Sequence, residues 1–124
     1  MTSVVTSRST PCVTLEMITW NKLVRDRVPE IIEASGTTAA TRVLDPDNFR
    51  TALLEKLREE TEELIRAEED EMANEAADVL EVVETLCELH GISLSDVLAK
   101  KAAKRASRGA FTQRLFLIHT IPRR

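Results

Sequence analysis

Two acidic stretches, Glu59–Glu63 and Glu75–Asp78, constrain this chain more than any other feature. Each stretch places two carboxylates three residues apart, Glu60 with Glu63 and Glu75 with Asp78. Residues three apart on a helix are neighbours on one face. Two such pairs on facing helices would form a cage of oxygen ligands, which Mg²⁺ prefers. The sequence therefore predicts two neighbouring helices with a candidate metal site between them.

The positions of the acids around the first helix indicate which of them are expected to be buried and which are expected to face solvent. At about 100° per residue, Leu53, Leu57 and Leu64 fall within roughly 60° of Glu60, so this carboxylate lies on the apolar stripe. Glu63 lies at the edge of the stripe. The opposite face carries the other charged residues of this helix, which are Glu55, Arg58, Glu62 and Arg66, while Glu59 is intermediate.

The second stretch repeats this pattern. Val79 and Val83 share an arc with Glu75, and Asp78 lies on its shoulder. The residues that point the other way are Glu81, Glu84 and Glu88. A carboxylate on a core-facing stripe carries a large desolvation cost unless it is paired or binds a cation. We therefore favour a shared metal site; the main alternative is a buried salt-bridge network with Lys56 and the downstream basic residues.

Start and stop signals divide the chain into helices. Asp45-Pro46 begins a helix that is expected to reach about Glu68, and the polar run 69–71 is the expected turn. The second long helix is expected to end near residue 90, before Gly91. A third begins at a capping-box-like Ser93 with Asp96 and ends at residue 109. A short helix over 29–34, with residue 26 as its cap, is also expected.

The predicted fold class is mainly α, an antiparallel helical bundle completed by dimerisation. A small two-stranded β element is expected from residues near 41–44 and 112–118, because both segments are β-prone. Leu54 and Ile65 lie away from the acidic stripe and are available for a subunit contact or for packing on the small sheet. Residues 1–16 are interpreted as a flexible N-terminal arm, and residues 17–124 as a single helical domain.

Charge is distributed unevenly along the chain. The net charge is −4, yet no acidic residue follows Asp96, and eight Lys or Arg residues do. Lys101, Lys104 and Arg108 recur at helical spacing and are candidates for binding substrate phosphates, as are Lys22 and Arg25. A solvated or acid-pairing face is the alternative for these basic residues.

The acidic block argues against a broad nucleic-acid footprint, so no nucleic-acid partner is expected. Neither a transmembrane run nor a signal peptide is recognisable, and the two cysteines form no ligand cluster. We therefore expect no membrane partner and a cytoplasmic location.

The chain resembles the MazG-like all-α nucleoside triphosphate pyrophosphatases, and it is closest to the short phosphoribosyl-ATP pyrophosphatase-like branch. The resemblance rests on the ExxE motif 60–63 followed by the ExxD motif 75–78. The flanking segments 21–26 (NKLVRD) and 104–114 are also similar, so that roughly residues 19–118 are covered. One departure is Ala110, where this branch leads us to expect a second glycine.

The resemblance implies Mg²⁺-dependent hydrolysis of a nucleoside triphosphate to the monophosphate and pyrophosphate. The exposed apolar positions Leu54 and Ile65 favour a homodimer or higher homo-oligomer. The resemblance also implies that Glu60, Glu63, Glu75 and Asp78 are metal ligands. Glu59, together with Glu60, is the expected catalytic residue, either as an outer ligand or by orienting water. Two alternatives stay open: phosphoribosyl-ATP hydrolysis in histidine biosynthesis, and a non-catalytic helical module that binds metal or a partner.

Overall fold

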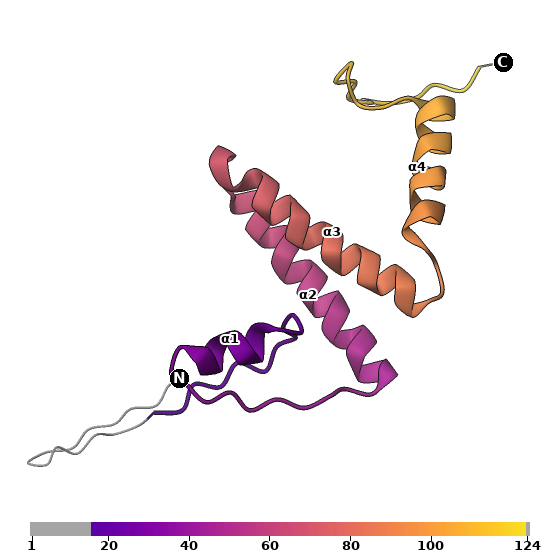
Figure 1. Ribbon diagram of the computed structural model, residues 1–124. Coiled ribbons are helices and arrows are strands. Elements are labelled where there is room, and N and C mark those ends of the chain that lie inside the picture. Colours follow the sequence, from indigo (N-terminus) through magenta and orange to yellow (C-terminus); the bar gives the residue numbers. More distant parts are fainter. Residues whose placement is uncertain (1–15, 124) are drawn as a thin grey trace, which may run out of the picture. The chain divides into compact units, whose positions relative to one another are not determined.

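A computed structural model describes residues 16–123 (Figure 1). Its elements, in chain order, are α1 (Val28–Ala34), α2 (Pro46–Arg66), the short 3-10 helix η1 (Glu69–Glu71), α3 (Met72–Leu89) and α4 (Leu94–Arg108). The chain divides into two compact units, one ending at Val83 and one beginning at Glu84. The arm predicted over residues 1–16 lies outside the described residues, apart from residue 16.

The start of α2 follows directly from the local sequence. Asp45 is the N-cap, and its two carboxylate oxygens accept hydrogen bonds from the backbone and side-chain N–H groups of Asn48, each at 2.8 Å. Pro46 occupies the first turn, where its missing N–H has no intrahelical partner to lose. The predicted start of this helix is confirmed, and its end at Arg66 falls two residues before the predicted one.

Loss of this cap should destabilise the protein measurably. We expect Asp45→Ala to lower the free energy of unfolding by about 1 kcal/mol, because the Asn48 N–H loses its acceptor at the helix end. Urea denaturation followed by circular dichroism measures this change. Thr61→Ala, at an exposed position in the same helix, is the control and should stay within about 0.5 kcal/mol of the parent. Equal stability of the two variants would contradict the capping role.

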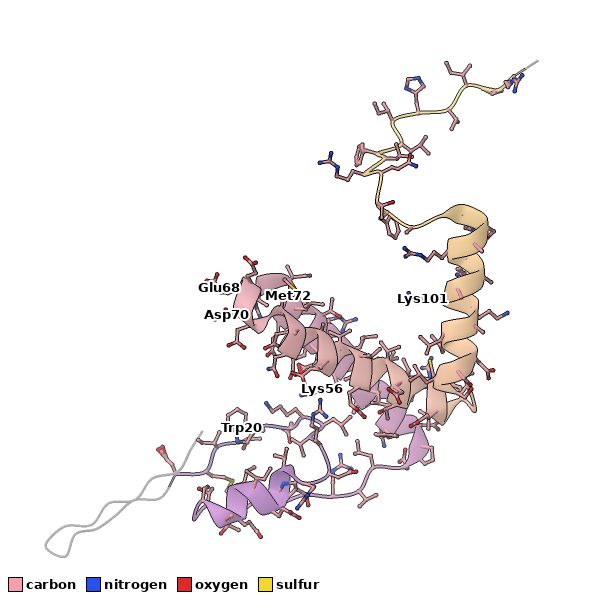
Figure 2. The ribbon with its side chains drawn as sticks, turned by 45° about the horizontal axis from the view of Figure 1, so that its top comes forward. Trp20, Lys56, Glu68, Asp70, Met72 and Lys101 are labelled. Atoms are coloured by element: carbon pink, nitrogen blue, oxygen red, sulfur yellow. The ribbon has the colours of Figure 1, made fainter. Side chains whose placement is uncertain are left out.

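In the first unit, α2 and the start of α3 form an antiparallel hairpin (Figure 1). The turn between them carries Glu68 and Asp70, both labelled in Figure 2. Among residues 16–123, only two apolar side chains are buried, Leu53 on α2 and Val82 on α3, at 2% and 7% exposed. Glu60 is buried beside them at 8% exposed. The packed face of the hairpin therefore includes a carboxylate, as the helical phase predicted.

In the second unit, two glycines with positive φ follow the ends of helices. Gly91 has φ 74° and follows α3, and Gly109 has φ 85° and follows α4. Both positions favour glycine because a Cβ is disfavoured at positive φ. Between them, the Ser93 hydroxyl accepts the Asp96 N–H at 3.2 Å, which confirms the predicted cap of α4.

Two predictions about local structure are wrong. The small β element is absent: the described part of the chain contains no strand, and residues 41–44 and 112–118 are irregular. A strand requires a backbone partner, and the second segment instead turns, with the Arg114 N–H donating to the Phe111 carbonyl at 3.2 Å. The cap expected from residue 26 is also absent, because the N-cap of α1 is Arg27, which makes no side-chain capping bond.

The helices in residues 16–123 are too short or too polar for any of them to cross a lipid bilayer.

Candidate active site

The acidic residues predicted on α2 and α3 converge within the first unit. Single carboxylate oxygens from Glu60, Glu75 and Asp78 all lie within 4.8 Å of one another. A second trio, Glu59, Glu60 and Glu63, satisfies the same distance. Glu60 belongs to both trios, so it is the centre of what we call the acidic cluster, defined as these five residues. The structure therefore brings together every acid that the sequence selected.

Two oxygens of the acidic cluster lack a hydrogen-bond partner among the described residues. They are Oε2 of Glu60 and Oε2 of Glu75, and both atoms are buried. Unsatisfied buried polar atoms are rare and costly in folded proteins. These two atoms come from different helices and belong to the same trio, so one cation between them would satisfy both.

Burial raises the pKa of the Glu60 carboxyl above its ordinary value of 4.5. The ammonium of Lys56 opposes this shift, whereas Glu63, Asp78 and Glu59 add to it through like charge. Burial also raises the pKa of Glu75, again with repulsion from neighbouring acids, which are Glu63, Asp78 and Glu71. Burial is the main cause of both shifts, and repulsion between the neighbouring carboxylates adds to it.

Arg25 lies at the edge of the acidic cluster. Its Nη2 donates to Oδ1 of Asp78 at 2.8 Å, across 53 residues of sequence. This contact joins the segment before α1 to α3. The sequence placed Arg25 among the phosphate-binding candidates but did not reveal its carboxylate partner, because no local spacing relates the two residues. The ion pair neutralises one acid of the cluster and leaves the buried oxygens of Glu60 and Glu75 without a partner.

Lys56 pairs with Glu59, a half-buried acid of the cluster. Its Nζ lies 3.0 Å from Oε1 of Glu59, one helical turn away on α2. A structural salt-bridge network was the main alternative to a metal site. The ion pairs in this region use Glu59 and Asp78, whereas the unpaired buried oxygens belong to Glu60 and Glu75. The salt-bridge network therefore leaves the buried oxygens of Glu60 and Glu75 without a partner, although their desolvation cost is large.

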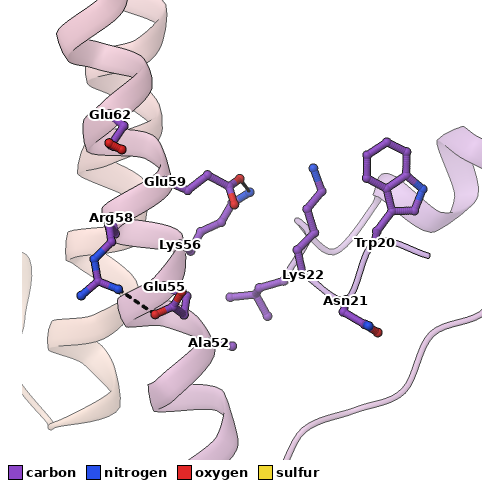
Figure 3. A pocket seen from close by; sticks show the side chains of 10 residues that line it. Trp20, Asn21, Lys22, Ala52, Glu55, Lys56, Arg58, Glu59 and Glu62 are labelled. Carbon is purple, nitrogen blue, oxygen red and sulfur yellow. Dashed lines mark hydrogen bonds and ion pairs between the residues drawn. The ribbon is translucent and has the colours of Figure 1, made fainter. Parts of the chain in front are cut away.

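A cavity of about 450 Å³ opens beside the acidic cluster (Figure 3). We call it the Trp20 cavity. One wall is formed by residues 20–23, including Lys22, and the other by α2 side chains, namely Ala52, Glu55, Lys56, Arg58, Glu59 and Glu62. Glu59 belongs to both the cavity lining and the acidic cluster, so the two are neighbours. The sequence reasoning missed Trp20; its only signal was a single tryptophan next to the NKLVRD segment.

The other basic candidates lie on the second unit. Lys101, Lys104 and Arg108 are exposed on α4 (Lys101 is labelled in Figure 2) and line a cavity of about 700 Å³ with Val97, Lys100, Arg105 and residues 109–111. Their proposed contact with phosphate stays a prediction. The helix dipole accounts for part of the clustering of basic residues on α4, because Arg105 and Arg108 lie in its last turn, where cations are favoured.

The donor set of the acidic cluster fits a hard divalent cation. Carboxylate oxygens are the ligands that Mg²⁺ binds in proteins, commonly together with substrate phosphates. The unpaired Oε2 atoms of Glu60 and Glu75 supply such ligands from two helices. Glu63 and Asp78 add two further carboxylates at the rim, one exposed and one half-buried.

Comparison with known proteins gives a partial match to one bacterial relative. A protein of Mycolicibacterium smegmatis (strain ATCC 700084 / mc(2)155), described as uncharacterized, is 48% identical over 54 residues. That match covers 44% of this chain and 55% of the relative, so it spans only about half of the relative's length. No solved structure gives a significant match.

The family match is broader. The sequence profile described as phosphoribosyl-ATP pyrophosphohydrolase matches residues 22–105, a stretch that contains Arg25, α1, α2, α3 and most of α4. It covers well over half of the chain and includes the whole acidic cluster. The chain therefore belongs to the phosphoribosyl-ATP pyrophosphohydrolase family, within the MazG-like all-α pyrophosphatases that its motifs resemble.

Proposed function

We propose that this protein is a Mg²⁺-dependent nucleotide pyrophosphohydrolase that converts a nucleoside triphosphate to the monophosphate and pyrophosphate. The observation that carries the proposal is the pair of buried, unpartnered carboxylate oxygens of Glu60 and Glu75 at the centre of the acidic cluster. Family membership supports the same chemistry, since the matching family is one of pyrophosphohydrolases.

The four acids Glu60, Glu63, Glu75 and Asp78 would hold the cation. When bound, a divalent ion supplies positive charge against the phosphate oxygens, where phosphoryl transfer needs it. The hairpin would hold the acids together before substrate arrives, because carboxylate oxygens from α2 and α3 already lie within 4.8 Å of one another and each helix carries a buried apolar side chain, Leu53 and Val82. The site is thus preorganised, and the protein need not gather like charges during the reaction.

Glu59 would orient the attacking water and accept its proton. Its carboxylate is held by Lys56 at 3.0 Å and lies at the junction of the acidic cluster and the Trp20 cavity. In the proposed step, water attacks the α-phosphorus and a proton passes to Glu59. The new P–O bond forms as the bridging bond to the β-phosphate breaks, and pyrophosphate leaves. Lys22, which lines the Trp20 cavity, and Arg25, which contacts Asp78, would supply positive charge for the phosphate chain.

Release of pyrophosphate tests this proposal. Purified protein with Mg²⁺ is incubated with normal and damaged nucleoside triphosphates and with phosphoribosyl-ATP, and pyrophosphate and monophosphate are quantified. We expect stoichiometric formation of both products from at least one nucleoside triphosphate, and loss of turnover in EDTA. Absence of pyrophosphate from every compound, with a folded protein, would favour the non-catalytic helical module instead.

Phosphoribosyl-ATP is the second candidate substrate, and the family description favours it. The acidic cluster holds metal and phosphate and does not read the base, so both substrates fit it equally. The same panel separates them: turnover confined to phosphoribosyl-ATP would assign the histidine-biosynthesis reaction.

We also propose that the chain acts as a homodimer. The first unit buries two apolar side chains, yet it leaves Ile65 of α2 76% exposed and Leu80 of α3 55% exposed. A helix hairpin with so small a core gains stability by packing against a second copy in a four-helix arrangement.

Light scattering with size-exclusion chromatography measures the assembly directly. We expect a dimer for the parent and a shift toward monomer for Ile65→Glu, because a charge would be buried at the contact. Ile31→Glu on α1, where the isoleucine is 62% exposed, is the matched control and should stay dimeric. A monomeric parent protein would refute this proposal.

A further inference from the structure

The Trp20 cavity contains an aromatic surface that the proposed hydrolysis does not use. The indole of Trp20 is 66% exposed although it borders a cavity. Lys22 Nζ lies 5.0 Å from the centre of the ring, a cation–π distance. Figure 3 shows Trp20 and Lys22 on a segment that faces the side chains of Lys56 and Glu59. Lys22 therefore lies over part of the ring, and most of the indole surface remains exposed.

The chemistry of this cavity matches one end of a nucleotide. Every nucleobase has a planar face that can stack on an exposed aromatic side chain. Glu59 lies in both the cavity and the acidic cluster, so a molecule with a flat ring and a charged chain can reach both regions at once. A volume of about 450 Å³ falls within the range of small-molecule sites.

The backbone at this wall is also unusual. Asn21, between Trp20 and Lys22, has φ 43°, in the left-handed region that most side chains avoid. Such conformations persist where the surrounding structure maintains them, and they cluster at ligand sites. Here the strained residue belongs to the cavity wall itself.

We propose that the Trp20 cavity receives the nucleobase of the substrate, with the base stacked on the indole of Trp20. This inference rests on the proposed nucleotide hydrolysis for the position of the phosphates at the acidic cluster. It assigns Trp20 as a binding residue that contributes to substrate affinity and leaves the chemical step to the acids.

Intrinsic fluorescence tests the base site without any turnover. The chain has one tryptophan and no tyrosine, so its tryptophan emission comes from Trp20 alone. Adenosine, guanosine, cytidine and uridine, which lack phosphate, are titrated into the full chain in EDTA, with free N-acetyltryptophanamide as the control for light absorption. We expect saturable quenching by at least one nucleoside and none by ribose 5-phosphate or pyrophosphate. Absence of saturable quenching by all four nucleosides would overturn the inference.

Kinetics of two Trp20 variants provide the second measurement. Trp20→Leu removes the stacking surface, and we expect KM to rise roughly 5- to 100-fold with kcat little changed, the range that base–aromatic stacking contributes. Trp20→Phe keeps an aromatic face and should recover most of this loss. Ile31→Ala, an exposed apolar side chain outside the cavity, should leave KM unchanged. An unchanged KM in Trp20→Leu would overturn the inference.

The two experiments separate this inference from the proposed function. Saturable quenching by a nucleoside in a protein that releases no pyrophosphate would support the base site while the hydrolase proposal fails. Pyrophosphate release with a normal KM in Trp20→Leu would retain the hydrolase and remove the base site.

Discussion

Replacing Glu60 by Gln is expected to abolish pyrophosphate release while the helices stay intact. Glu60 belongs to both acid trios, is 8% exposed, and carries one of the two unpartnered buried oxygens. The amide keeps the size of the side chain but removes its charge, so a cation would lose its central ligand. We expect a loss on the order of 100-fold or more, because loss of even an outer-shell partner of a metal site costs about 10- to 100-fold.

The measurement combines turnover with helix content. Initial rates are measured at saturating nucleotide over a range of Mg²⁺ concentrations, and circular dichroism verifies that the helices are retained. Asp78→Asn should give a comparable loss, since Asp78 belongs to the same trio. Glu84→Gln is the matched control on α3: Glu84 belongs to neither trio, and its replacement should leave the rate almost unchanged. Near-normal turnover in Glu60→Gln would refute the assignment of Glu60 as a ligand.

This prediction was accessible from sequence because helical phase is a local property. Glu60 and Glu75 interrupt apolar stripes that repeat every three or four residues, and the structure buries the first and half-buries the second. The ends of the long helices were similarly encoded, by Asp45 before Pro46 and by Gly109 after α4. In each case the residues that indicate the feature lie within about one helical turn of it.

What the sequence did not reveal depends on contacts between distant residues. The Arg25–Asp78 ion pair spans 53 positions, and neither residue has a neighbour that indicates the other. The Trp20 cavity likewise needs the segment before α1 to lie against α2.

The predicted β element failed for a related reason. The apolar residues near Phe116 have the composition of a strand, but composition does not provide a second strand to pair with. Phe116 is 90% exposed, so burial does not organise this segment either.

Stability should depend on pH and Mg²⁺ in a way that reports on the acidic cluster directly. The pKa of Glu60 and of Glu75 is raised in the folded protein above the ordinary value of 4.5. The folded state therefore holds more protons than the unfolded state above that pH, and the free energy of unfolding falls as pH rises through the folded pKa values. The charged groups around these two carboxyls are Lys56, Glu59, Glu63, Glu71 and Asp78, with Arg25 on Asp78.

Thermal unfolding in EDTA between pH 5 and pH 8 measures this effect. We expect the midpoint to fall with rising pH in EDTA and to recover on addition of Mg²⁺, with a larger recovery at the higher pH, because Mg²⁺ binds the ionised form of a carboxylate. An ion present at 100 times its dissociation constant stabilises the folded state by about 2.7 kcal/mol. Recovery of this size would show that the cation binds the folded chain and not only the substrate.

Glu60→Gln makes the same experiment specific to the cluster. Without the buried charge, its midpoint in EDTA at pH 8 should exceed that of the parent, its pH dependence should be shallower, and Mg²⁺ should raise it less. Glu84→Gln should behave like the parent in all three respects. A parent midpoint that rises from pH 5 to pH 8 in EDTA, or an equal Mg²⁺ effect in Glu60→Gln, would contradict a cation held by these buried oxygens. Either result would mean that the buried carboxylate of Glu60 is not the group that binds the cation.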